Sequence, residues 1–288
     1  MLRIIRLNRV WQVWLLLLAA GCSPASPVIV PEISSPTPGW TATASSPAAS
    51  PSPTPSPSPT ATPQPQTLIC SPLEGYELAQ LATQISNPYH PPPPGSDDPH
   101  YGVDLADFSL PERIARSGMA VQAILSGRAA GVLVNRFPYG NMLIVETPLS
   151  DLDDQTVSRL NLPDPPAGAI QPLALTCPPS ALAEDWRGRP RSLYLLYAHL
   201  RDAPNATLGS AVTCGQAIGA IGDSGNALAP HLHLEARIGP AGMDFPSMAH
   251  YDPSATNEEM AAYCLWRISG LFQSIDPMCL LDECSSAP

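Results

Sequence analysis

Short apolar runs, rather than long helical stripes, dominate the chain after about residue 100. They are rich in Val, Ile, Leu and Tyr and are separated by glycine and proline, a pattern typical of strands joined by turns. Four runs are predicted to be strands: Val121 to Leu125, Met142 to Val145, Ser192 to Tyr197 and His231 to Ala236. We therefore expect a mainly β fold built on an antiparallel sheet.

One stretch near the C-terminus has helical periodicity instead. Apolar side chains recur there at the spacing of one helix face: Met260, Cys264, Ile268, Leu271 and Phe272. Thr256 and Glu259 precede this stripe in the capping-box pattern, in which each side chain accepts a hydrogen bond from the other residue's backbone N–H. The pattern predicts one C-terminal helix whose apolar stripe packs against the core.

The first 22 residues have the features of an export signal. Three arginines precede an apolar run, Val13 to Ala20, that is too short to span a bilayer comfortably. The following Ala-Ala-Gly-Cys sequence, which ends at Cys22, resembles the bacterial lipoprotein box, whose cysteine is lipidated. An ordinary secretory signal is the alternative. We expect an exported protein that is lipid-anchored through Cys22 at the cell envelope, either at the outer face of the cytoplasmic membrane or in the periplasm.

Residues 23–66 have a composition that cannot bury a core. Proline, serine, threonine and alanine dominate, and Glu32 is the single charged residue. Such chains favour polyproline II, which rises about 3.1 Å per residue, so the segment can extend on the order of 100 Å. It is predicted to be a disordered tether between a signal peptide at 1–22 and one domain at 67–288.

The other six cysteines form an even set, which in an exported protein predicts up to three disulfides: Cys70, Cys177, Cys214, Cys264, Cys279 and Cys284. The sequence leaves their pairing open.

The chain is strongly acidic. Without the signal's three arginines, it has 11 positive and 25 negative residues. A surface this acidic is a poor partner for nucleic acid or anionic wall polymers.

Candidate metal ligands lie in two clusters about 130 residues apart. The first runs from His100 to Asp104, and the second is His231-Leu232-His233. Because side chains alternate along a strand, both histidines of the second cluster point into one space. A catalytic zinc site takes about three nitrogen or carboxylate ligands and leaves a place for water. His100, Asp104 and one histidine of the second cluster supply that number.

A lone H-x-x-x-D pattern is weak evidence, because most histidines are packed or surface residues. The chain has only six histidines, however, and four of them lie beside apolar, strand-like runs: His100, His199, His231 and His233. Such a concentration favours a site.

Five segments occur in the order seen in the LytM/lysostaphin-type zinc peptidases, peptidase family M23, and resemble them. They are His100 to Ala106, Gly118 to Ala123, Tyr139 to Asn141, Leu196 to Leu200, and Gly222 to Gly225 with Pro230 to Glu235. The resemblance spans about residues 87 to 238, and Ile275 to Pro277 is similar to the family's closing segment. It implies the antiparallel β-sheet groove of these peptidases, with long loop insertions at 148–191 and 239–274.

The resemblance also implies residue roles. Zinc ligands fall on His100, Asp104 and His233, and the two catalytic histidines that do not bind metal fall on His231 and His199. The implied activity is zinc-dependent hydrolysis of peptide bonds in peptidoglycan stem peptides or cross-bridges through a metal-activated water. We take His231 as the base and His199 as the oxyanion partner, each worth about 10² to 10⁴ in rate.

Glu235 lies on the same strand face as His231 and His233, so it is a candidate for orienting a metal ligand without binding the metal itself; a surface glutamate is the alternative.

Two other functions stay open. The first is a non-catalytic cell-wall binding or activator lipoprotein on the same fold, although no core position is missing here. The second is a structural lipoprotein whose histidines are incidental. No protein partner is indicated.

Gly222 to Gly225 (GDSG) also resembles the nucleophile segment of chymotrypsin-like serine peptidases. Such a serine needs a histidine base oriented by an aspartate. The upstream histidine is His199, and the one aspartate between them and outside the GDSG, Asp202, is only three residues from it. A turn before a strand, with Gly225 providing a permissive backbone, is the better interpretation.

The insertion at 148–191 exceeds about 12 to 15 residues, a length above which loops in compact domains are uncommon and usually functional or disordered. It holds several prolines and Cys177, which would restrict it. Because it leads into the run that bears His199, our hypothesis is that it folds over one wall of the groove and selects which peptides enter. A surface decoration away from the site is the alternative.

Overall fold

The computed structural model describes residues 66–108, 114–165, 176–178, 188–281 and 284. All of them belong to one compact unit, Thr60–Pro288. The predicted signal peptide, Cys22 and nearly all of the predicted tether lie outside the described residues. Within the described ranges, none of the helices has the length and apolar character that a membrane span requires.

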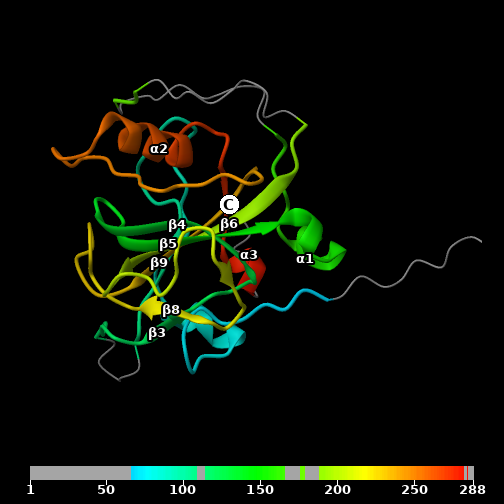
Figure 1. The fold of residues 1–288 in the computed structure, drawn as a ribbon. Helices are drawn as coiled ribbons and strands as arrows, with labels where there is room; N and C mark the ends of the chain where they lie inside the picture. The colour runs from blue at the N-terminus through cyan, green and yellow to red at the C-terminus, as the bar shows by residue number, and fades with distance from the viewer. Residues whose placement is uncertain (1–65, 109–113, 166–175, 179–187, 282–283, 285–288) are drawn as a thin grey trace, which may run out of the picture. The chain divides into compact units, whose positions relative to one another are not determined.

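An antiparallel sheet of eight strands forms the centre of the unit (Figure 1). Seven strands follow in the spatial order β1 (Ile85–Asn87), β2 (Val103–Leu105), β9 (Leu232–Pro240), β6 (Arg191–Leu200), β5 (Gly140–Pro148), β4 (Gly127–Arg136) and β7 (Ala211–Val212). The eighth strand, β10 (Gln273–Ile275), also pairs with β9. A second sheet pairs β3 (Ala120–Gln122) with β8 (Ala217–Ala220). The prediction of a mainly antiparallel β fold is confirmed.

The described helices are few and short. They are the 3₁₀ helices η1 (Leu78–Gln84) and η2 (Leu149–Asp151) and the α-helices α1 (Asp154–Arg159), α2 (Asn257–Arg267) and α3 (Met278–Leu281). The predicted helix is α2, and its capping box is present: Thr256 Oγ1 accepts from the Glu259 N–H at 3.2 Å, and Glu259 Oε2 accepts from the Thr256 N–H at 2.9 Å. The expectation of one C-terminal helix missed α3.

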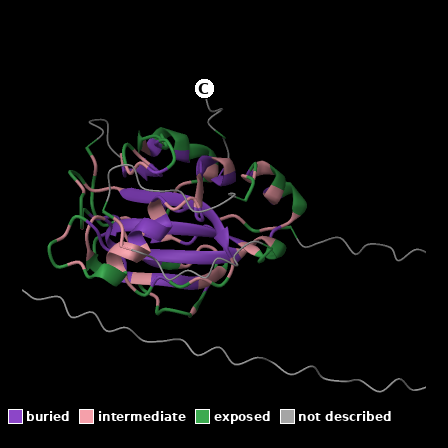
Figure 2. Cartoon of the chain, turned by 90° about the horizontal axis from the view of Figure 1, so that it is seen from above, coloured by how far each residue is buried: buried purple, intermediate pink, exposed green. Residues whose placement is uncertain are grey.

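The central strands are buried on both faces, as Figure 2 shows. Along β6, Leu193, Leu195 and Tyr197 belong to one hydrophobic cluster. The alternate residues of the strand join a second cluster, which contains Trp266 of α2. Helix α2 therefore covers one face of the sheet. Burial on both faces explains why these strands read as continuous apolar runs rather than as an apolar and polar alternation.

The polar residues of β9 lie on the face that α2 covers. His233 pairs with Ala198 of β6, and Glu235 pairs with Leu196. Directly opposite residues of an antiparallel pair share a face. Ala198 and Leu196 belong to the α2-side cluster, so His233 and Glu235 lie on that side as well. This register places the candidate site residues of β9 on the face of the sheet that α2 covers.

Two predicted strand limits need correction. The strand predicted at Val121 to Leu125 ends at Gln122, and Ile124 N–H donates instead to the Tyr197 hydroxyl at 2.9 Å. His231 lies just before β9, where its backbone N–H donates to the Gly222 carbonyl. The other two predicted runs lie inside the longer strands β5 and β6.

All six remaining cysteines form disulfides, as the even count predicted. The pairs are Cys70–Cys214, Cys177–Cys264 and Cys279–Cys284, with S–S distances of 1.97, 2.03 and 2.07 Å. Three disulfides indicate an oxidising, exported environment. The second pair ties segment 148–191 to α2, so the two predicted insertions are joined covalently.

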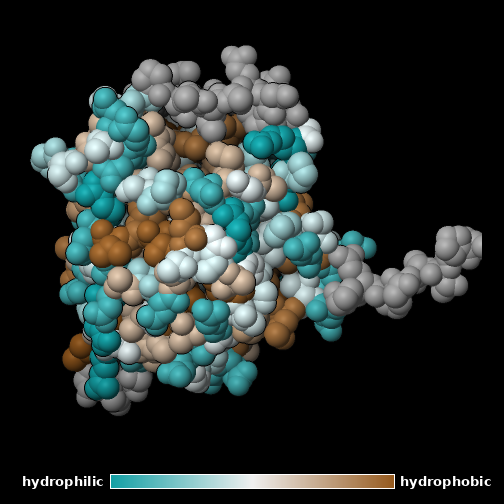
Figure 3. Space-filling view, viewed as in Figure 1, coloured by the Kyte–Doolittle hydropathy of each residue, from teal (hydrophilic) through white to brown (hydrophobic). Residues whose placement is uncertain are grey.

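Hydrophobic side chains are unevenly distributed over the surface (Figure 3). On the face seen in Figure 3, hydrophobic side chains gather in a patch below α2, and hydrophilic side chains make up much of the surrounding surface. The large hydrophobic side chain with the highest exposure among the described residues belongs to Leu228. This residue lies in the loop before His231.

Candidate metal centre

Three side chains from adjoining segments converge at one end of the α2-side face of the sheet. Asp104 on β2 pairs with His233 on β9, and His100 lies just before β2. The His100 Nε2 atom lies 3.0 Å from Asp104 Oδ1 and 3.1 Å from His233 Nδ1. The Asp104 and His233 atoms are 2.8 Å apart. The structure therefore brings His100 and Asp104 of the first sequence cluster together with His233 of the second.

The outer nitrogen of each histidine ring already has an acceptor. His100 Nδ1 lies 3.1 Å from the Pro88 carbonyl oxygen, and His233 Nε2 lies 3.1 Å from Glu235 Oε1. In a neutral ring, which is the form that binds a metal, a proton on the outer nitrogen leaves the inward nitrogen as an acceptor. The two inward nitrogens then converge with the Asp104 carboxylate oxygen as three acceptors.

Three converging acceptors require a cation or a proton among them. Tetrahedral zinc with nitrogen and oxygen ligands at roughly 2.0 to 2.1 Å places its ligand atoms about 3.3 Å apart. The observed separations of 2.8 to 3.1 Å differ from this by a few tenths of an ångström. The donor set of two imidazoles and one carboxylate also suits zinc. The residues present fit the ion.

The electrostatics agree with this geometry. Burial alone would raise the pKa of Asp104, but hydrogen bonds from His100 and His233 hold that pKa well below its usual range. Burial would lower the pKa of His233, but its bonds to Asp104 and Glu235 raise the pKa of the ring to about 9. The site therefore favours positive charge between its carboxylates, which a metal ion supplies in place of the proton.

Asn87 and Gly102 shape the site, and the sequence analysis missed both. Asn87 Nδ2 donates to Asp104 Oδ2 at 3.2 Å, so the carboxylate turns its other oxygen toward the histidines. At Gly102, a Cβ atom would lie 2.5 Å from the Leu234 carbonyl oxygen and 2.9 Å from the His233 ring. Only glycine allows the first cluster to approach β9 this closely, a signal that the H-x-G-x-D spacing contained.

The two other site histidines lie beside this group. His231 Nε2 lies 3.5 Å from Asp104 Oδ1, and the ring centroids of His199 and His231 are 4.8 Å apart. In both rings Nδ1 faces a backbone carbonyl: Ala229 at 2.8 Å for His231, and Ser224 at 2.7 Å for His199. Nε2 is thus the free nitrogen in each ring. All five sequence-predicted metal and catalytic residues meet in one place.

His199 sits in an unusual conformation and environment. It has a φ of 59°, in the left-handed region that non-glycine residues avoid. Burial first, and then the neighbouring rings of His233 and His231, lower the pKa of His199 to about 3. The ring is therefore neutral at neutral pH, with an unprotonated Nε2.

Ser224 of the GDSG segment holds neighbouring residues in place through hydrogen bonds. Its hydroxyl donates to the Leu200 carbonyl at 2.7 Å and accepts from the Asn141 N–H at 2.9 Å, and its carbonyl holds His199. Gly225 has a φ of 75°, and a Cβ atom there would lie 2.4 Å from the Pro138 carbonyl oxygen. These contacts agree with the predicted turn rather than with a serine nucleophile.

Glu235 is fully buried and lies at the centre of a hydrogen-bond network. Its Oε1 atom accepts from His233, from the Tyr139 hydroxyl at 2.7 Å and from Arg267 Nη1 at 2.7 Å. Its Oε2 atom accepts from Arg237 Nε at 2.7 Å and from Trp266 Nε1 at 3.0 Å. Burial would raise the pKa of Glu235, but the two arginines and His233 hold it well below its usual range. The alternative of a surface glutamate is wrong.

The site opens into a groove of about 520 Å³. Besides the five histidine and aspartate residues, its walls are formed by Ser86, Asn87, Pro99, Pro138, Tyr139, Asn226, Leu228, Ala229 and Arg267. These residues come from β1, from the segment just before His100, from the turn before β5, from the loop before His231 and from the last residue of α2. This volume lies within the usual range of ligand sites, about 300 to 1,000 Å³.

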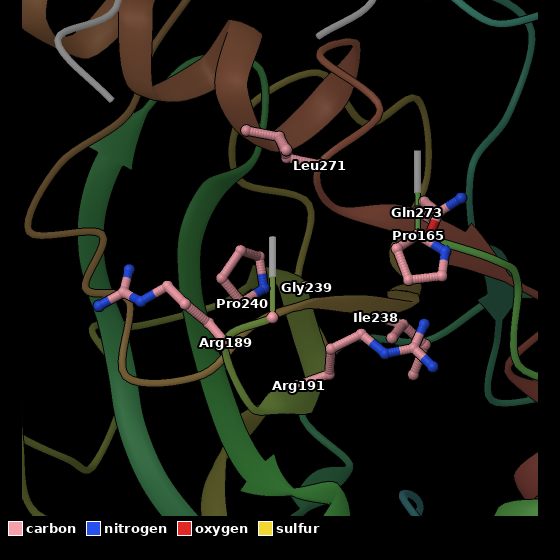
Figure 4. A pocket seen from close by; sticks show the side chains of 9 residues that line it. Pro165, Arg189, Arg191, Ile238, Gly239, Pro240, Leu271 and Gln273 are labelled. Atoms are coloured by element: carbon pink, nitrogen blue, oxygen red, sulfur yellow. The ribbon is translucent and has the colours of Figure 1, made fainter. Parts of the chain in front are cut away.

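Among the described residues, none from segment 148–191 lines this groove. Figure 4 shows where several of them lie: Pro165, Arg189 and Arg191 line a smaller pocket of about 140 Å³ with Ile238 to Pro240. On β9 the residues of this pocket, Ile238 to Pro240, lie five to seven positions from His233, or roughly 16 to 23 Å at strand rise. The described part of the segment thus gives no support to the hypothesis that it gates the groove.

No protein-family model matches the sequence, and no curated protein does. Solved structures are similar to it. The catalytic domain of the prophage-encoded M23 protein EnpA from Enterococcus faecalis has 19% identity and a TM-score of 0.30, covering 55% of this chain and 81% of that one. The catalytic domain of the antimicrobial peptidase lysostaphin from Staphylococcus simulans has 19% identity and a TM-score of 0.33, covering 72% and 98%.

A zinc-containing peptidase from Vibrio cholerae has 19% identity and a TM-score of 0.29, covering 59% of this chain and 36% of that one. The chain resembles M23 peptidases. Because the identities are below 25% and the TM-scores below 0.5, a function for this M23-like chain has to rest on its own motifs and on the geometry of its site.

Proposed function

We propose that this protein is a zinc-dependent endopeptidase. His100 Nε2, Asp104 Oδ1 and His233 Nδ1 are the ligands in this proposal. The observation that carries it is the meeting of three acceptor atoms within 2.8 to 3.1 Å, with the outer nitrogen of each histidine already bonded to an oxygen. Complete ligand and histidine positions favour an enzyme over a non-catalytic relative of the same fold.

Bound zinc lowers the pKa of a water toward about 7 and polarises the scissile carbonyl. The chain's own residues then handle protons and charge. In both His199 and His231, Nδ1 faces a backbone carbonyl and Nε2 is free. A pKa of about 3 makes His199 a weak base, because an effective base has a pKa near the working pH. We therefore propose His231 as the base and His199 as the oxyanion partner.

The proposed substrate is the peptide part of bacterial peptidoglycan, either a stem peptide or a cross-bridge. The support is the set of five sequence segments similar to LytM/lysostaphin-type peptidases, together with an open groove beside the metal site. The domain organisation proposed with it is a signal peptide at 1–22, a tether at 23–66 and the peptidase domain at 67–288.

Digestion of purified peptidoglycan tests this function. With zinc present, the protein is expected to hydrolyse an amide bond of the wall and to release soluble fragments. Mass spectrometry of these fragments identifies the bond. A chelator should stop the release. Binding to wall material without any released fragment, at full zinc occupancy, would support the alternative function of a non-catalytic wall-binding or activator lipoprotein.

A separate prediction concerns the anchor. If Cys22 is lipidated, the native protein partitions into detergent and its N-terminal peptide carries a diacylglycerol mass. The Cys22→Ser protein is expected to be mis-processed or released from membranes, since the proposed lipid is attached through the Cys22 sulfur. Phase partitioning and N-terminal mass analysis check this. A mature N-terminus at another residue without lipid would contradict the anchor, and an ordinary secretory signal would then explain the export.

A further inference from the structure

We propose that Arg267, the last residue of α2, is a positioning residue that holds both histidine ligands of the metal site indirectly, through Glu235 and Asp97. The inference rests on the zinc site proposed above. Arg267 belongs to segment 239–274, which lies outside the five segments that resemble M23 peptidases. It acts through Glu235 and Asp97, and so it connects an insertion of this chain to the reaction centre.

The first connection runs to His233. Arg267 Nη1 donates to Glu235 Oε1 at 2.7 Å, and the same oxygen faces His233 Nε2 at 3.1 Å. Glu235 is fully buried, and the Arg267 side chain is only 10% exposed. A charge-assisted bond in such surroundings holds the carboxylate in one orientation. That orientation in turn keeps the proton on His233 Nε2 and leaves Nδ1 free for the metal.

The second connection runs to the chain just before His100. Arg267 Nε donates to Asp97 Oδ1 at 2.5 Å, and Arg267 Nη2 donates to the Asp97 carbonyl at 3.2 Å. The hydroxyls of Tyr251 and Tyr263 donate to Asp97 Oδ2 at 2.7 and 2.8 Å. Asp97 lies three residues before His100, so these bonds fix the backbone from which the first ligand projects.

One guanidinium thus joins two ligand segments that are about 130 residues apart in sequence. The planar fork of arginine bonds two carboxylates in different directions, which the single ammonium of lysine does less well. Arg237 also bonds Glu235, but its Nη1 atom bonds the carbonyls of Trp266 and Phe272 rather than a second carboxylate. The bridging role therefore falls on Arg267.

Zinc affinity of full-length variants tests the proposal. Arg267→Met keeps the length of the side chain and removes its charge and donors. We expect it to weaken zinc binding by about 10- to 100-fold, the usual effect of removing an outer residue that orients a metal ligand. Competition with a chromogenic chelator measures the affinity, and thermal unfolding of the metal-free proteins measures stability. Arg267→Lys is expected to lie between wild type and Arg267→Met.

Arg136→Met is the matched control. Arg136 forms the other ion pair that anchors α2, with Glu259 in the first turn of the helix at 2.5 Å. Its loss should lower stability through the same helix while leaving zinc affinity within about threefold of wild type. A role of Arg267 that is only structural would make the two variants behave alike.

Wild-type zinc affinity in a folded Arg267→Met protein would overturn the positioning role. If that protein does not fold, Asp97→Asn, which keeps the shape of the side chain, decides in the same assay: an affinity loss of about 10-fold supports the role, and no loss overturns it. His100→Ala separates the two proposals. If His100→Ala loses zinc, the metal site stands whatever Arg267 does; if it retains zinc, the site fails and the role of Arg267 fails with it.

Discussion

Replacement of His100, Asp104 or His233 by alanine is expected to abolish zinc binding and to lower peptide hydrolysis by at least about 10³-fold. Each change leaves two of three protein ligands, too few to hold the ion at its usual affinity. A metal supplies several kcal/mol of stabilisation to the transition state, and about 1.4 kcal/mol corresponds to a tenfold change in rate. Metal content after dialysis and the rate of fragment release from peptidoglycan measure the two effects.

His90→Ala is the control for these variants. His90 is adjacent to His100 in space, but the pair is held through main-chain hydrogen bonds of 3.1 Å in each direction, which alanine retains. It does not line the groove. This protein should keep its zinc and its activity. Full zinc occupancy in the His100→Ala or Asp104→Ala protein would show that the ion binds elsewhere.

Replacement of His199 or His231 is expected to leave zinc bound and to lower hydrolysis by about 10² to 10⁴-fold. Neither side chain is among the three proposed ligands, whereas both line the groove beside them. At His199, asparagine is the better substitute than alanine, because it tolerates the positive φ of 59° at lower cost. The comparison then reports the loss of the imidazole rather than backbone strain.

Metal analysis and digestion of peptidoglycan by the same protein samples separate binding from catalysis. Loss of zinc in the His199→Asn protein would make that residue a ligand and would require a different site. Hydrolysis close to the wild-type rate in either variant would remove that histidine from the mechanism. Loss of activity in only one of the two would identify which histidine the reaction needs.

Local patterns in the sequence predicted much of the architecture. Runs of four to six apolar residues indicated the strands, and the Thr256 and Glu259 pair indicated where α2 begins, as the structure confirms. Strand alternation also indicated that Glu235 shares a face with His233. Periodicity and capping depend on residues a few positions apart, so they can be read without knowledge of the fold.

The five histidine and aspartate positions of the site were also predictable, because the spacing within each cluster is local and the order of the segments resembles a known family. That spacing carried no distances. It did not show that Asn87 turns the Asp104 carboxylate, or that Ser224 holds Nδ1 of His199. Both contacts join residues separated by 17 and 25 positions, and they arise only when the strands pair.

The sequence by itself therefore determined the class of fold and the start of α2, which follow from short-range periodicity and capping. It also determined the candidate ligands, through the spacing within each cluster and the resemblance to a known family. The tertiary structure decided how the six cysteines pair, which nitrogen of each histidine is free, and that Arg267 of α2 reaches both Glu235 and Asp97. The local sequence around each cysteine does not distinguish among the many possible pairings. In the same way, the sequence around an arginine at a helix end does not identify the residues that it will bond. Only the closure of long loops by burial of the two hydrophobic clusters selects among these possibilities.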